Sequence, residues 1–188
     1  MKHIFLVALT TILSTTLFGQ NQIQIDFEND GKMDNANLKK TEEGYFIQYT
    51  LSTDGKKHTT KIITMGGQEN KLTVKKNVLI INSQFMRGEN YFKFRYDKKQ
   101  KKIILIGYDN NQYGNASNDG SGSSSYNLIT GNYEANWYSF DENKNELFLL
   151  PTISKKLPIK IYTMDNFSDK TIEEIDDIGY KLLPEKLK

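Results

Sequence analysis

Apolar and polar residues alternate with a period of two along most of the chain. The pattern is clearest from Tyr45 to Leu51, where apolar side chains stand at every second position. Such alternation predicts a β-strand with one buried face. Comparable segments run over 71–74, 78–85, 91–96, 102–108, 126–130, 133–140 and 146–150, with a last candidate at 159–163.

Turn-forming residues separate these segments and predict hairpins between them. Asp54-Gly55 is the strongest of these signals, and it predicts a return strand over 58–65. A two-residue turn at this point would place Tyr49 opposite Thr60. The many short strands favour a single antiparallel β-rich domain, built as a sandwich or an open barrel of hairpins.

The C-terminal region alone has the spacing of an amphipathic helix. Ile172, Ile175 and Ile178 form one apolar stripe, and Ser168 is a favourable N-cap residue. Gly179 is predicted to limit the helix at its far end. The fold class that follows is mainly β, with one C-terminal α-helix.

Residues 1–19 have the three-part layout of a secretory signal peptide. A basic start at Lys2 precedes an apolar run over 4–17, and Gly19 supplies a small residue at the cleavage point. The apolar run is shorter than the roughly 20 residues that span a membrane. We therefore expect a single domain over 20–188 that is secreted or periplasmic, with no membrane insertion after cleavage.

Composition excludes several kinds of site. The chain has no cysteine and two histidines, so disulfides, thiolate nucleophiles and iron–sulfur clusters are ruled out. His3 lies in the predicted leader, which leaves His58 alone in the mature chain, and no G-x-S-x-G nucleophile motif is present. The net charge of +2 gives no reason to expect nucleic-acid binding.

The most specific local signal is the acidic loop D-F-E-N-D-G-K-M-D over 26–34. Acids stand at positions 1, 3, 5 and 9 of this loop, and glycine stands at position 6. Alternating carboxylates in a tight loop can converge on one hard cation, and oxygen ligands favour calcium. The alternative is a solvated acidic turn that joins two strands.

This spacing resembles the D-x-D-x-D-G-x-x-D loop of FG-GAP-type repeats and dockerins, in which the loop binds calcium. Two departures are Glu28 in place of the usual Asp, and Asn37 where an EF-hand has a bidentate Glu. The resemblance implies a ligand set made of four side chains and the carbonyl of Lys32: Asp26, Glu28, Asp30, Lys32 and Asp34.

A longer stretch carries a second resemblance. The segments F-K-F-R-Y over 92–96, L-I-G-Y-D over 105–109 and S-Y-N-L-I-T-G over 125–131 resemble small secreted proteins of the Bacteroidota type. This resemblance implies an exported β-rich protein and no particular activity.

The segment 109–125 is rich in Asn, Asp, Gly and Ser, and it predicts a long loop without regular structure. Amide and carboxylate groups beside tyrosine rings are suited to binding a glycan or a protein; the alternative is a flexible, solvated loop. The candidate contact surface consists of Tyr108, Asp109, Tyr113, Asn115, Asp119 and Tyr126.

These features together favour an exported, non-catalytic binding or interaction domain whose N-terminal loop is stabilised by calcium. A periplasmic inhibitor or immunity-type protein, directed against a toxin or a hydrolase, is one alternative. The other is a small hydrolase that uses carboxylates only, for which Asp109, Asp119 and Glu134 are available.

Overall fold

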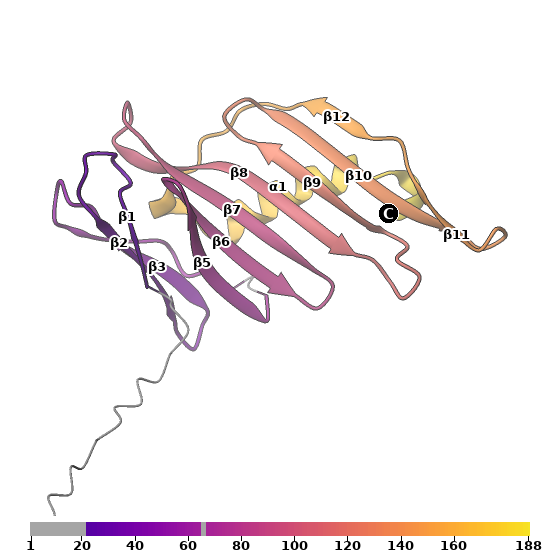
Figure 1. Ribbon diagram of the computed structural model, residues 1–188, viewed down its shortest axis with the longest axis horizontal. Helices are drawn as coiled ribbons and strands as arrows, with labels where there is room; N and C mark the ends of the chain where they lie inside the picture. Colours follow the sequence, from indigo (N-terminus) through magenta and orange to yellow (C-terminus); the bar gives the residue numbers. More distant parts are fainter. Residues whose placement is uncertain (1–21, 65–66) are drawn as a thin grey trace, which may run out of the picture.

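The computed structural model describes residues 22–64 and 67–188, so the predicted signal peptide lies outside the described residues. Two antiparallel sheets and one α-helix near the C-terminus make up the described residues (Figure 1), which confirms the predicted fold class. The helices are η1 (Met164–Asn166), α1 (Asp169–Leu182) and η2 (Glu185–Leu187). The strands are β1 (Gln22–Ile25), β2 (Asp34–Lys40), β3 (Tyr45–Thr50), β4 (Lys57–Thr59), β5 (Glu69–Lys75), β6 (Val78–Phe85), β7 (Gly88–Asp97), β8 (Lys102–Tyr113), β9 (Ser121–Asn127), β10 (Asn132–Asp141), β11 (Glu146–Leu149) and β12 (Ile153–Lys156).

The small sheet has the order β1-β2-β3-β4, and the large sheet has the order β11-β10-β9-β8-β7-β6-β5. Strand β12 also pairs with β10, alongside its residues 132–135, while β11 pairs with its residues 138–141. Neighbouring strands in the large sheet follow one another in sequence, as expected for a run of hairpins. The sheets remain open and do not close into a barrel.

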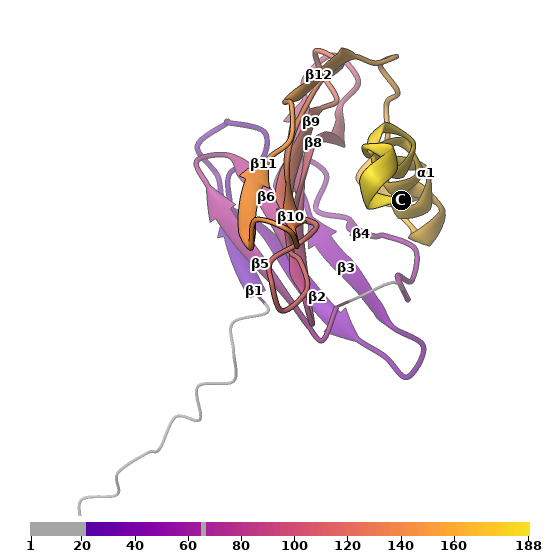
Figure 2. The ribbon, with the colours of Figure 1, turned by 90° about the vertical axis from the view of Figure 1, so that its right-hand side faces the viewer.

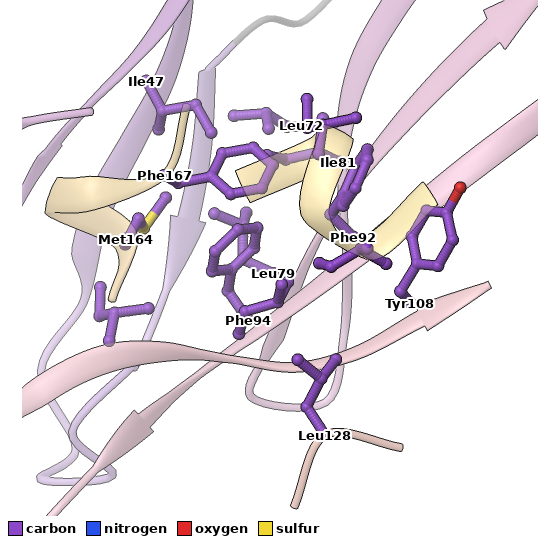
Figure 3. Packing of buried hydrophobic residues seen from close by; sticks show 14 of the residues in the cluster. Ile47, Leu72, Leu79, Ile81, Phe92, Phe94, Tyr108, Leu128, Met164 and Phe167 are labelled. Atoms are coloured by element: carbon purple, nitrogen blue, oxygen red, sulfur yellow. The ribbon is translucent and has the colours of Figure 1, made fainter. Parts of the chain in front are cut away.

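Helix α1 lies along one face of the large sheet (Figure 2). A single apolar core joins this face to the small sheet and to the segment before the helix. Phe167 packs edge-on against Phe92 and Phe94, with ring centroids 5.1 Å apart in both pairs (Figure 3). Phe167 and Ile172 are both buried, as a hydrophobic staple at the start of α1 requires.

Three local predictions are wrong in register or extent. Tyr49 pairs with His58 and not with Thr60, because the connection after β3 is wider than a two-residue turn. The segment 159–163 is not a strand and forms only one isolated bridge, at Thr163. Helix α1 runs through Gly179 and ends at Leu182.

The predicted long loop over 109–125 is also wrong. Strand β8 continues to Tyr113 and β9 begins at Ser121, so only 114–120 forms the turn. Asn118 and Gly120 adopt positive φ values of 60° and 75°, which Asn and Gly allow at low cost. The strand ends resemble a loop in sequence because polar residues stand on both of their faces.

Candidate functional site

The acidic loop between β1 and β2 uses its carboxylates to hold its own backbone. Asp26 accepts hydrogen bonds from the amides of Asp30 and Gly31, at 3.0 and 2.9 Å. Asp30 accepts one from the Lys32 amide at 2.9 Å. Turns built on a side-chain carboxylate therefore fix the shape of this loop.

Two further carboxylates of the loop are buried. Asp34 is 1% exposed and accepts hydrogen bonds from the amides of Phe27 and Ser52, at 2.8 and 2.7 Å. Glu28 accepts a hydrogen bond from the Thr53 hydroxyl at 2.7 Å. Burial raises the pKa of Asp34, its backbone hydrogen bonds oppose that rise, and the charge of Glu28 adds to it.

The predicted calcium ligands thus share one loop, but their carboxylates serve separate partners. Across residues 22–64 and 67–188, no group of three or more Asp, Glu or His side chains is arranged to hold a metal ion. In this arrangement Asp26 and Asp30 accept hydrogen bonds from loop amides, and their carboxylates keep further lone pairs that a cation could use. Calcium binding stays a prediction.

The predicted contact surface is divided among several places. Tyr108 and Tyr126 are buried on the face of the large sheet that α1 covers. Asp109 lies on the opposite face, where it forms an ion pair with Lys93 and accepts a hydrogen bond from Ser125 at 2.8 Å. Adjacent residues of one strand therefore serve different faces, as the strand period requires.

The remaining three residues of that set lie at the β8–β9 turn. Tyr113 is exposed at the end of β8, and Asn115 shapes the turn through its side-chain oxygen. Asp119 accepts a hydrogen bond from the Phe140 amide at 2.7 Å and so ties the turn to β10. Asn115 and Asp119 thus have structural partners within the chain.

The sheet face beneath α1 carries a cleft of about 500 Å³. Its floor is built from neighbouring strands, since Tyr108 pairs with Tyr126 and Tyr126 pairs with Tyr133 across β8, β9 and β10. Two residues further on the same face stand Asn110 on β8, Ser124 on β9 and Ala135 on β10, and Trp137 follows Ala135 on that face. The floor of the cleft includes Tyr108, Tyr126, Tyr133, Asn110, Ser124 and Trp137.

Helix α1 supplies the opposite wall of the cleft, including Ile175, Asp176 and Gly179. The hydroxyl of Tyr108 donates a hydrogen bond to Oδ1 of Asp176, with the two oxygens 2.6 Å apart. A Cβ added at Gly179 would stand 3.9 Å from the hydroxyl oxygen of Tyr133. Gly179 therefore lets the backbone of α1 lie close to the hydroxyl of Tyr133.

Two polar atoms in the wall of the cleft have no hydrogen-bond partner. They are Oη of Tyr133 and Nε1 of Trp137, whose residues are 3% and 6% exposed. Burying a polar group without a partner costs about 1–3 kcal/mol, so such groups are rare and call for a reason. Sequence reasoning missed both residues, which alternate with polar neighbours along β10 like ordinary core positions.

The helix wall and the sheet floor of the cleft each hold a group whose pKa is raised by burial. Burial raises the pKa of Asp176; the hydrogen bond from Tyr108 lowers it, and the nearby charge of Asp177 raises it. Burial also raises the pKa of Tyr133, and the neighbouring Ser124 hydroxyl, whose geometry falls short of a hydrogen bond, lowers it. Asp176 is the one acidic residue in the lining, and no lysine or arginine lines the described cleft.

The opposite face of the large sheet carries a second depression, of about 460 Å³. Its lining is polar and includes Asp109 and Glu134, two of the three carboxylates considered for hydrolysis, whereas Asp119 is not part of it. Among the described residues, none in this lining carries a buried polar atom that lacks a hydrogen-bond partner. The cleft beneath α1 is therefore the stronger candidate site.

Comparison with known proteins adds no relative: no family model, no curated protein and no solved structure matches the chain. Among the described helices, none is long and apolar enough to cross a membrane. The evidence for function is therefore the geometry of the chain itself.

Proposed function

We propose that this protein is an exported, non-catalytic binding protein that holds a small ligand in the cleft between α1 and strands β8–β10. The observation that carries the proposal is the pair of unpartnered buried atoms, Tyr133 Oη and Trp137 Nε1. A ligand that supplied hydrogen bonds to both would remove the cost of burying them. The volume of about 500 Å³ falls in the range of small-molecule sites.

Gly179 supports the same proposal. A glycine in the interior of a helix is about 1 kcal/mol less favourable than alanine. Here it stands beside Tyr133, in the helix wall of the cleft, where a larger side chain would enter the open space. Trp137 is held in place from the other side, since a Cβ at Gly122 would stand 2.6 Å from its Cε3 atom.

A neutral, apolar fluorescent dye, N-phenyl-1-naphthylamine, tests the cleft directly. Trp137 is the only tryptophan of the chain, so energy transfer from tryptophan to the dye reports binding close to this residue. We expect saturable transfer at one dye per chain. Gly179→Leu fills the cleft and should abolish it, whereas Lys181→Leu adds the same side chain at an exposed helix position outside the lining.

The proposal fails if the dye gives no saturable transfer, or if Gly179→Leu binds it as well as the unmodified protein does. Thermal melts of both leucine variants are the folding control. An unchanged or raised melting temperature for Gly179→Leu shows that loss of binding comes from the filled cleft.

A further inference from the structure

We infer that the ligand of this cleft is a neutral, hydroxyl-rich ring of the size of one or two sugar units. The inference rests on the proposed binding function and specifies the chemistry of its ligand. It follows from the kinds of hydrogen-bonding groups in the walls and from the charge that these walls carry.

The polar groups of the two walls favour a ligand that both accepts and donates hydrogen bonds. The indole nitrogen of Trp137 can only donate, so its partner must be an acceptor. Asp176 can only accept when ionised, and its Oδ1 takes the Tyr108 hydroxyl, which leaves Oδ2 for a donor. Hydroxyl groups do both, since each has one donated hydrogen and two acceptor lone pairs.

The tyrosine side chains of the floor favour a ligand that also presents apolar C–H groups. Tyr108, Tyr126 and Tyr133 stand in register across three strands, and Tyr126 meets Tyr133 edge-on at a centroid distance of 6.4 Å. A pyranose ring presents C–H groups on its faces and hydroxyls around its rim. Its faces would lie on the tyrosines while its rim meets Trp137 and Asp176.

The same walls disfavour two other classes of ligand. A hydrocarbon chain or an apolar dye can occupy the cleft but leaves Nε1 of Trp137 and Oη of Tyr133 without a partner, so it should bind less tightly than the natural ligand. A phosphate or carboxylate would meet the charge of Asp176 in a lining without lysine or arginine. A neutral polyol satisfies both constraints.

The test is competition between sugars and N-phenyl-1-naphthylamine on the purified protein, followed through Trp137. The panel contains neutral hexoses, N-acetylhexosamines, their disaccharides, and the uronate that corresponds to each hexose. We expect at least one neutral sugar to displace the dye and shift the tryptophan emission. We expect the matched uronate to bind at least tenfold more weakly.

Two conservative variants connect the result to the walls. Asp176→Asn should weaken the active sugar about tenfold and Tyr133→Phe roughly fivefold, each relative to that variant's own measured dye affinity. The matched controls are Asp177→Asn, which is exposed on α1, and Tyr138→Phe, which is partly exposed on the other face of β10. Neither control should change sugar affinity.

Each outcome gives a decision. Dye binding without displacement by any neutral sugar overturns the polyol and leaves the binding function standing. Tighter binding of the uronate, or equal losses in the Asp176 and Asp177 variants, also overturns the polyol. Absence of binding by both dye and sugars overturns the sugar and the binding function together.

Discussion

The acidic loop and the cleft beneath α1 treat their polar groups in opposite ways. In the loop, Asp34 is buried and yet fully engaged, since two backbone amides donate to its carboxylate. In the cleft, Tyr133 and Trp137 are buried to a similar degree, and their polar atoms have no partner. The hydrogen bonds of the loop stabilise the fold. In the cleft, the free-energy penalty of burying two polar atoms is not offset by any hydrogen bond within the chain.

This difference shows where a ligand has most to contribute. The loop has a recognisable motif, but its carboxylates already meet the needs of the backbone around them. The cleft has no motif, and its unpartnered donors are the groups that gain most from a bound molecule. In this chain, buried polar atoms without a hydrogen-bond partner therefore indicate a candidate site that no familiar spacing of residues marks.

The largest effect is expected from Asp34→Ala. This change leaves the amides of Phe27 and Ser52 buried without an acceptor, which should lower the free energy of unfolding by about 3 kcal/mol. The control is Asp26→Ala, which also removes the acceptor of two amides but at an exposed site, and should cost less than about 1 kcal/mol. Equal losses in urea unfolding would contradict the difference between buried and exposed acceptors.

Tyr133→Phe should change stability in the opposite direction. Removal of an unpartnered buried hydroxyl should raise the free energy of unfolding of the ligand-free protein by about 1 kcal/mol. Tyr126→Phe is the matched control, because that hydroxyl donates to the carbonyl of Pro158 at 2.8 Å and its loss should cost about 1 kcal/mol. Calorimetric melts of the two variants in parallel test the sign, and a loss in both would show that Tyr133 has an internal partner.

Much of the fold was predictable from the sequence, because period-two alternation reports one buried face. Strand β10 was predicted over 133–140 and spans Asn132–Asp141. Ser168 stands at the predicted N-cap position of α1, although its side chain makes no capping hydrogen bond. The cleft was not predictable, since it depends on the separation between a helix and a sheet that no local pattern encodes. The one available signal was the polar residues Asn110 and Ser124 at inward-facing positions, which were interpreted as part of a loop.

Asp176→Asn is expected to have a smaller effect that depends on pH. Burial raises the pKa of Asp176 above its ordinary value of 3.8, so the folded protein keeps this proton to higher pH than the unfolded chain does. The contribution of this group to stability is present at acid pH and is lost as pH rises through the raised pKa. The variant should therefore be more stable than the unmodified protein at pH 7, by less than about 1 kcal/mol, because the Tyr108 hydrogen bond offsets part of the burial cost.

Denaturant melts across a pH series measure this difference. The advantage of Asp176→Asn should shrink as pH falls toward 3.8, where Asp176 gains its proton in both states. Asp177→Asn, at an exposed position, is the control and should show no such trend. A constant advantage across the series would show that the charge of Asp176 is not its cause.

The smallest expected effect is the rise in stability when calcium is added. It tests whether the acidic loop binds the ion that its motif predicts. Because no group of three or more carboxylates in the described residues is arranged to hold an ion, we expect weak affinity, with a dissociation constant of about 1 mM. At about 2 mM calcium, such a site adds roughly 0.6 kcal/mol to the free energy of unfolding, a rise of about 2 °C in the melting temperature. Melts with calcium, magnesium and a chelator measure this rise, and Asp30→Asn should reduce it. Identical midpoints in all three conditions, with no calcium retained after dialysis, would show that the loop holds its shape through its amides alone.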